Sequence, residues 1–265
     1  VQFPCDLAAY GGLEIIGNMR LDALGRQEWV YNRTKLNRLG IDAKFAAGHV
    51  KGYLETFDDH QIYGKGFQGL VGMDFNGIGH FEAMALFGKK DFKYFFIDAQ
   101  ASLSTGIPVG PIEISGFVGG VSYKMNVHAS ENGGISNTTS LPPVGQSFSG
   151  NTYIPDSIYA LGLRAGVKMQ MKNNPKIFNG SVVYEILFNA EKPDGTGGGV
   201  ANMALDGKGM LMAVGNITQP VVQGTDNKPT GMDGASMTAH IRFKYDFNAK
   251  IFTGDLIAYL NAGYL

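Results

Sequence analysis

The sequence predicts an all-β fold, in which long antiparallel hairpin repeats form a meander of about 10–13 strands, arranged as a barrel or a sandwich. Three observations predict it. Apolar and polar residues alternate with a period of two, one hairpin pattern occurs twice, and glycine is abundant within apolar segments, with 38 residues in 265. Interior glycines suit bulged and bent strands, whereas each would cost a helix about 1 kcal/mol.

The alternation is clearest in segments 161–172 and 235–247. Apolar residues occupy every second position in both, as in Leu163, Val167 and Phe243, and the positions between them are small, polar or charged. Because successive side chains of a strand point to opposite faces, we expect the apolar rows to lie in a core and the polar rows in water. Val167 and Phe243 are therefore predicted core residues.

Each of these segments leads into a similar partner. Lys176-Ile177-Phe178-Asn179-Gly180 follows the first, and Lys250-Ile251-Phe252-Thr253-Gly254 follows the second. The sequence thus predicts a hairpin repeat at 161–189 and 235–262. Further strands are predicted at 41–57, 61–75, 78–88, 92–104 and 112–126.

The domain organisation follows from where this rhythm begins. Residues 1–40 lack a clear period, and we expect an N-terminal strand, helix or covering segment there. Residues 41–265 are expected to form the antiparallel β domain, with long loops at 128–157 and 215–233. The chain begins with Val1 instead of Met, so we expect a segment of a longer protein.

Composition excludes several classes of function. The formal net charge is −1, from 22 basic and 23 acidic side chains, which provides no broad positive field for nucleic acid. Cys5 is the only cysteine, so neither an intramolecular disulfide framework nor a cysteine-based zinc site is available.

Motifs that carry chemistry are weak. Residues 64–69 match G-x-G-x-x-G, but the residues that follow alternate like a strand, whereas a dinucleotide site needs a helix there. Residues 145–150 resemble a nucleophile elbow without its second glycine. The five histidines show no metal-binding spacing, and the acidic Asp58-Asp59-His60 is expected to be a hairpin turn. We therefore predict no catalytic, cofactor-binding or metal-binding residue and no cofactor, and we expect no enzyme activity.

The segments Leu86–Lys89, Phe117–Tyr123 and Lys176–Gly180 resemble the glycine-rich β segments of very large exported bacterial proteins. These include cell-surface proteins and the cargo or effector proteins, among them toxins, of phage-tail-like contractile injection systems. The resemblance covers about 40–265. It implies a non-catalytic structural or interaction domain of a larger exported protein. Its partners would be other domains of the parent chain or a carrier assembly.

Two other functions remain open at this point. A barrel or sandwich with an apolar cavity would carry a small apolar ligand such as a lipid. Strands of this length also suit an outer-membrane β-barrel. Against a membrane, predicted short turns follow one another near 58, 76 and 89, and no aromatic rows are evident at both strand ends. On the sequence alone, a membrane is therefore the least favoured of the partners considered.

Overall fold

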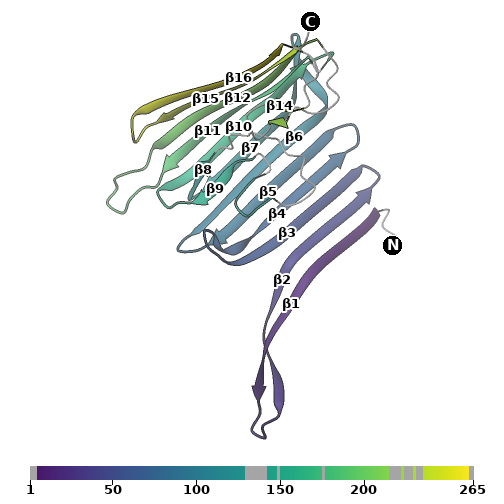
Figure 1. Ribbon diagram of the computed structural model, residues 1–265, viewed down its shortest axis with the longest axis vertical. Helices are drawn as coiled ribbons and strands as arrows, with labels where there is room; N and C mark the ends of the chain where they lie inside the picture. The colour runs from purple at the N-terminus through teal and green to yellow at the C-terminus, as the bar shows by residue number, and fades with distance from the viewer. Residues whose placement is uncertain are drawn as a thin grey trace.

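The structure is a computed structural model that describes residues 5–128, 142–147, 150–174, 177–214, 222–223, 229–230 and 235–262. Its main feature is one sheet of twelve antiparallel strands, which follow one another across the sheet in chain order (Figure 1). The predicted all-β antiparallel meander is therefore confirmed. Among the described residues, no helix has the length and apolar composition that crossing a membrane requires.

The twelve strands of the sheet are β1 (Cys5–Leu21), β2 (Gln27–Phe45), β3 (Gly48–His60), β4 (Gly64–Phe75), β5 (Gly79–Lys89), β6 (Lys93–Val109), β7 (Ile112–Tyr123), β10 (Tyr159–Met171), β11 (Phe178–Asn189), β12 (Val200–Val214), β15 (Ala235–Asp246) and β16 (Ile251–Ala262). Two short hairpins lie outside the sheet, made of β8 (Met125–His128) with β9 (Thr152–Pro155), and β13 (Val222–Gln223) with β14 (Pro229–Thr230).

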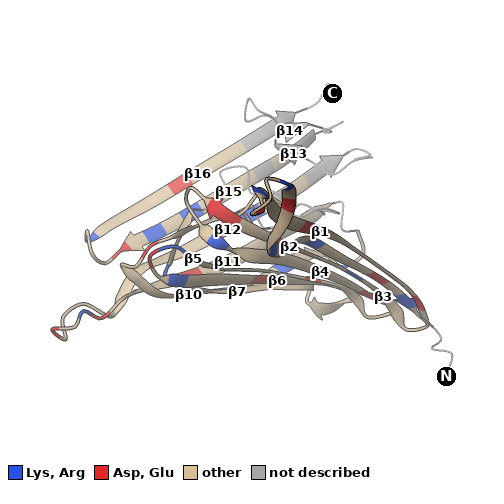
Figure 2. Ribbon diagram, turned by 90° about the horizontal axis from the view of Figure 1, so that it is seen from below, with Lys and Arg blue, Asp and Glu red and all other residues tan. Residues whose placement is uncertain are grey.

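The sheet is curved but not closed. In Figure 2, β1 and β2 at one end and β15 and β16 at the other both lie above the central strands β6 and β7. β1 and β16 are the two end strands of the sheet order and do not pair with each other. The sequence leaves a barrel and a sandwich open, and the sheet that the described residues form is not closed into a barrel.

The N-terminal part of the chain belongs to this same sheet. The expected strand, helix or covering segment forms β1 and most of β2, and their hairpin projects beyond the other strands (Figure 1). The predicted strand 41–57 is interrupted at Ala46 and Ala47, where β2 turns into β3. Alanine is not a typical turn residue, so the composition contains no signal for this turn.

The strand register divides the sheet into two faces. Met84, Asp98 and Arg164 lie on the face that we call the covered face, because the segment between β7 and β10 packs on it. We call the opposite side, which carries Phe87 and Ala165, the open face. The two predicted hairpins are β10–β11 and β15–β16, and their predicted apolar rows lie on the open face.

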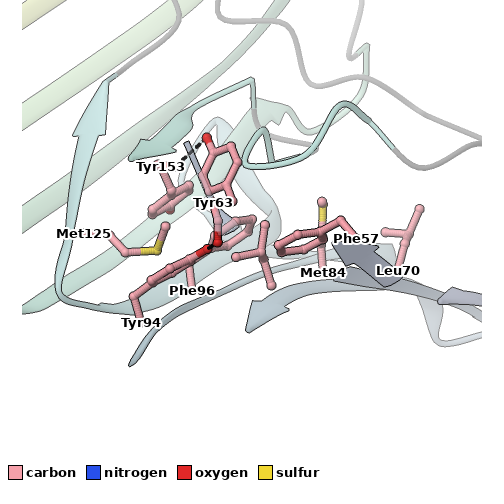
Figure 3. Close-up of a cluster of buried hydrophobic side chains, with 9 residues drawn as sticks. Phe57, Tyr63, Leu70, Met84, Tyr94, Phe96, Met125 and Tyr153 are labelled. Carbon is pink, nitrogen blue, oxygen red and sulfur yellow. Dashed lines mark hydrogen bonds between the residues drawn. The ribbon is translucent and has the colours of Figure 1, made fainter. Parts of the chain in front are cut away.

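A buried aromatic and aliphatic cluster lies between the covered face and the segment that follows β7. Figure 3 shows its side chains in contact from β3 to β9. The cluster consists of Phe57, Tyr63, Leu70, Met84, Leu86, Tyr94, Phe96, Met125 and Tyr153. It is the hydrophobic core of the described residues, and it occupies only one part of one face.

Two glycines show why this sheet needs residues without side chains. A Cβ atom on Gly88 would lie 2.2 Å from the Tyr94 hydroxyl, and one on Gly17 would lie 2.3 Å from the Trp29 ring. Aromatic rings of a neighbouring strand therefore lie directly across the glycine backbone. Such an arrangement is a known way of stabilising glycine within a strand.

Candidate functional site

The open face is the largest unusual feature of the molecule. Phe243 and Leu163 on this face are 42 % and 41 % exposed, whereas the Arg164 side chain on the covered face is only 13 % exposed. The apolar rows are thus the more exposed ones. The prediction that Phe243 lies in a core is therefore wrong, because no second layer of described residues covers this face. Val167, three strands away on β10, is half-buried.

Large apolar side chains are exposed on this face from one end of the sheet to the other. They include Leu39, Ile41, Phe67, Phe117, Leu163, Tyr184, Leu205, Ile241, Phe243, Phe252 and Leu256. Soluble monomers rarely expose a continuous apolar patch of more than a few hundred Å². The extent of this surface therefore indicates that something apolar covers it.

Aromatic residues form a row on the open face near one end of the central strands. Phe67, Phe87, Phe95 and Tyr123 are cross-strand neighbours, with ring centroids 5.2, 5.6 and 5.7 Å apart in turn. All three ring pairs are stacked at interplanar angles of 21–27°. The row runs across four adjacent strands and gives this end of the open face a distinct aromatic border.

Lysines lie immediately beyond the aromatic row. Lys65, Lys89 and Lys93 are exposed and follow one another across β4, β5 and β6 in the register of the open face. Within the described positions between this lysine row and the opposite strand ends, the register places no Asp, Glu, Lys or Arg on the open face. The charges are therefore confined to the border.

The covered face is polar and charged outside the buried cluster. Asp98 is fully buried, and both of its carboxylate oxygens lie 3.2 Å from the same Arg164 guanidinium nitrogen. Further along the sheet, His240 Nε2 lies 3.0 Å from Asp206 Oδ2. Charged segments recur along these strands in Figure 2. Opposite charges close together offset much of the cost of partial burial.

A chain of polar contacts crosses the covered face from β4 to β10. The two ring nitrogens of His80 lie 2.5 Å from Asp74 and 3.1 Å from Glu82. Gln100 donates a hydrogen bond to Glu82 and accepts one from Lys168 at 2.7 Å. The chain joins β4, β5, β6 and β10. Because Asp74 and Glu82 lie at different ring nitrogens, the two carboxylates do not converge on one point.

The segment after β7 is fixed to the covered face by aromatic contacts. We call its described residues 124–128, 142–147 and 150–157 the cover. The Tyr153 ring stacks on Phe96, with centroids 4.2 Å apart and planes 12° from parallel. The Tyr63 hydroxyl donates a hydrogen bond to the Tyr153 carbonyl at 2.9 Å. Burial raises the pKa of both tyrosines, so both stay neutral hydroxyl groups.

Two hollows lie at the surface of the described residues. One is an apolar groove of about 380 Å³ on the open face, with Gly52, Gly69 and Ala83 among its lining residues. The other, of about 550 Å³, lies at the strand ends beside Lys90 and Pro155. The apolar groove is open to the surroundings and is part of the open face. It is therefore not the interior cavity that a ligand carrier would need.

The residues that the sequence analysis set aside as weak motifs are not brought together in the structure. Residues 64–69 lie on β4, as the strand interpretation requires, and Gly64 begins that strand with a positive φ of 64°. Residues 58–60 end β3, and 145–147 lie in the cover. Among the described residues, no cluster of His, Cys, Asp or Glu has the geometry of a metal site.

The chain stands apart in comparison with known proteins. No protein-family model, no curated protein and no solved structure matches it. The two faces of the sheet are therefore the features from which a function can be inferred.

Proposed function

We propose that this chain is a non-catalytic, membrane-embedded β protein. The open face contacts lipid acyl chains, and the covered face lines an aqueous space that the cover partly fills. The observation that carries the proposal is the inverted exposure of β10, where Leu163 is 41 % exposed and the Arg164 side chain 13 %. An apolar solvent on one side accounts for this inversion, as it does in barrels with polar interiors.

The dimensions of the open face support the same conclusion. Its apolar row on β10 runs over eleven residues, from Leu161 to Met171. At about 3.3 Å per residue this is about 33 Å of strand, which spans about 23 Å when the strand is tilted by about 45°. Apolar bands of membrane β proteins are about 25 Å tall. The row thus fits the hydrocarbon layer.

The residues at the border of the open face also support the proposed membrane location. Aromatic side chains are enriched at membrane interfaces, where one end of the ring system is wet and the other apolar. The stacked row of Phe67, Phe87, Phe95 and Tyr123 is followed by Lys65, Lys89 and Lys93, whose ammonium groups would reach the lipid headgroups. Apolar, aromatic and basic rows thus follow one another in the order expected for a protein surface that passes from the hydrocarbon layer of a bilayer to its headgroups.

The proposal changes the ranking of partners that the sequence suggests. The sequence places the membrane last because of its turns, and the exposed fractions now argue for it. An interaction module of a soluble assembly would also need a partner on the open face, but the described apolar rows run without a charged residue from the lysine border to the opposite strand ends, which suits a lipid layer. Export from a bacterium stays a prediction.

The test is partition between water and lipid. The full 265-residue chain is unfolded in urea and then diluted either into buffer or into vesicles of short-chain phosphatidylcholine. The single tryptophan, Trp29, reports insertion through quenching by brominated lipid. We expect quenching and strand circular dichroism in vesicles, and aggregation in buffer. A monodisperse, folded monomer in detergent-free buffer, with no quenching in vesicles, would exclude the proposal.

A further inference from the structure

Both end strands of the sheet have an edge without a partner among the described residues. β1 pairs only with β2, and β16 pairs only with β15. In a bilayer no water is present to bond these edges, so every backbone N–H and C=O must find a protein partner. The membrane-embedded sheet proposed above therefore requires a partner for each edge.

The register across the sheet is progressively staggered. A line of directly opposite residues starts at Tyr10 on β1 and ends at Thr253 on β16, through Gly40, Tyr53, Leu70, Met84, Asp98, Gly120, Arg164, Glu185, Ala204 and Lys244. Beyond this line, β1 continues to Leu21, eleven residues on, whereas β16 continues only to Ile251, two residues on. The sheet is thus a parallelogram with β1 projecting at one corner.

A closed barrel requires this kind of stagger. Strands in a barrel tilt against its axis, and the register must shift by a fixed amount around the circumference. Eight-stranded barrels with a tilt of about 36° have a shift of about eight residues, or roughly one residue per strand. Twelve strands then need a shift of roughly twelve residues. The eleven-residue extension of β1 beyond Tyr10 is of this length.

We propose that the open sheet of the structure closes when the chain is inserted in a bilayer: β16, which pairs only with β15 in the open sheet, then also pairs with the projecting half of β1, Leu13–Leu21, and a twelve-stranded barrel forms within one chain. A shift of about twelve residues brings Thr253 level with the end of β1 and Met19 opposite Leu256. This inference rests on the proposed membrane location. It gives the projecting hairpin a role that an open sheet does not give it.

The two faces match across this junction. Leu13, Ile15 and Met19 on β1 are 62 %, 60 % and 59 % exposed and continue the open-face row, as Leu256 does on β16 at 67 %. Both register irregularities between β1 and β2 place their additional residue in β2, so the alternation along β1 is unbroken. Pairing Met19 with Leu256 therefore joins apolar to apolar, whereas a slip of one residue would mix the faces.

Disulfide cross-linking tests the junction and its register. All variants carry Cys5→Ser and Leu256→Cys, and the second cysteine is placed at Met19 or Leu21 for the staggered register, or at Leu7 for the unstaggered one. Asn18→Cys is the matched control for the wrong face. Oxidation is carried out on the chain inserted in phosphatidylcholine vesicles, and products are separated by electrophoresis before and after reduction.

We expect a fast-migrating, intramolecular cross-link in most molecules with cysteine at Met19 or Leu21, and at least tenfold less with cysteine at Leu7 or Asn18. A dominant cross-link at Leu7, disulfide-linked dimers, or no cross-link at any position would each overturn the closure. Quenching of Trp29 is measured on the same samples. Quenched samples without the expected cross-link refute the closure alone, whereas unquenched samples refute the membrane location.

Discussion

Replacing Ala165 by lysine tests whether the open face is surrounded by lipid or by water. Ala165 is the seventh of the thirteen residues of β10, it is exposed, and it lies opposite Gly119 on β7 and Tyr184 on β11. The open face therefore has room for a longer side chain there. The effect of Ala165→Lys depends almost entirely on what lies outside the sheet.

The two surroundings predict different magnitudes. In water, a substitution at an exposed strand position changes the free energy of unfolding by about 0.5 kcal/mol or less. At the midplane of a bilayer, lysine costs a β-barrel about 2–4 kcal/mol. Since about 1.4 kcal/mol is a factor of ten, the folded, inserted population falls by roughly 30- to 700-fold relative to the unfolded one.

A lysine on the other face of the same strand is the matched control. Gln170 on β10 donates a hydrogen bond to Glu113 at 2.6 Å on the covered face. Gln170→Lys keeps a donor at this place and adds a charge beside the carboxylate, so we expect a change of less than about 1 kcal/mol. Ala165→Leu, at the same open-face position, is expected to be neutral or stabilising in lipid.

The assay is equilibrium unfolding by urea in phosphatidylcholine vesicles, followed by Trp29 fluorescence and circular dichroism. We expect a loss of about 2–4 kcal/mol for Ala165→Lys and nearly wild-type curves for Gln170→Lys and Ala165→Leu. Equal stability of all four proteins in vesicles would refute the reasoning. So would a soluble, well-folded Ala165→Lys protein whose wild-type parent behaves identically without lipid.

Three further substitutions test the interior of the structure, each by urea unfolding unless stated. Asp98→Ala leaves the Arg164 guanidinium without its buried carboxylate, and we expect the free energy of unfolding to fall by about 3–5 kcal/mol. Adding Arg164→Met should reduce this loss, because no charge is then left without its partner. Additive losses from the two substitutions would contradict the pairing. Tyr153→Ala removes a buried ring of the cover, and we expect the free energy of unfolding to fall by about 3–5 kcal/mol. Proteolysis within residues 124–157 should become faster. Unchanged cleavage would show that contacts other than the Tyr153 ring fix the cover to the sheet. Gly88→Val forces the Tyr94 ring away, and we expect the free energy of unfolding to fall by about 1–3 kcal/mol. Gly77→Ala, in a turn at φ 76°, should lower it by only about 1 kcal/mol, which is the backbone strain.

The strands and their order were predictable because they depend on local signals. The alternation around Val167 and Phe243 predicted β10 and β15 and their partners, since a period of two admits no other regular structure. The Asn76-Gly77 turn followed from the positive φ that glycine tolerates. No turn residue occupies Ala46 or Ala47, and only a change of parity marks this turn: the open-face apolar residues are odd-numbered before it, as Ile41 is, and even-numbered after it, as Val50 is.

The surroundings of each face were not predictable from the alternation. A strand with Leu163 on one side and Arg164 on the other has the same pattern whether its apolar side meets a second layer or lipid. The distinction needs the whole sheet, because only then is it evident that no described element packs on the open face. The sequence-based reasons against a membrane were the succession of short turns and the lack of aromatic rows at both strand ends, and neither depends on which face of the sheet is exposed.

For a related reason, the sequence could not decide between a strand, a helix and a covering segment for the N-terminal residues. Arg33, Lys35 and Arg38 next to Trp29 and Leu36 suggest an amphipathic helix or a loop when taken alone. In the structure the two residues that break the alternation of β2 are accommodated as bulges opposite an unbroken β1. A bulge inserts one residue and so inverts the apparent period, and a single strand without its partner cannot show this.

The cover has a consequence for what the covered face can do. Phe96 and Met84 on this face are fully buried by it, together with Tyr153. Strands that lined an empty aqueous passage would carry polar residues at these positions, as they do at Arg164 and Lys168 on β10. The apolar cluster therefore depends on the cover for its burial, and the covered face consists of an apolar part under the cover and a charged part that extends over β10–β15.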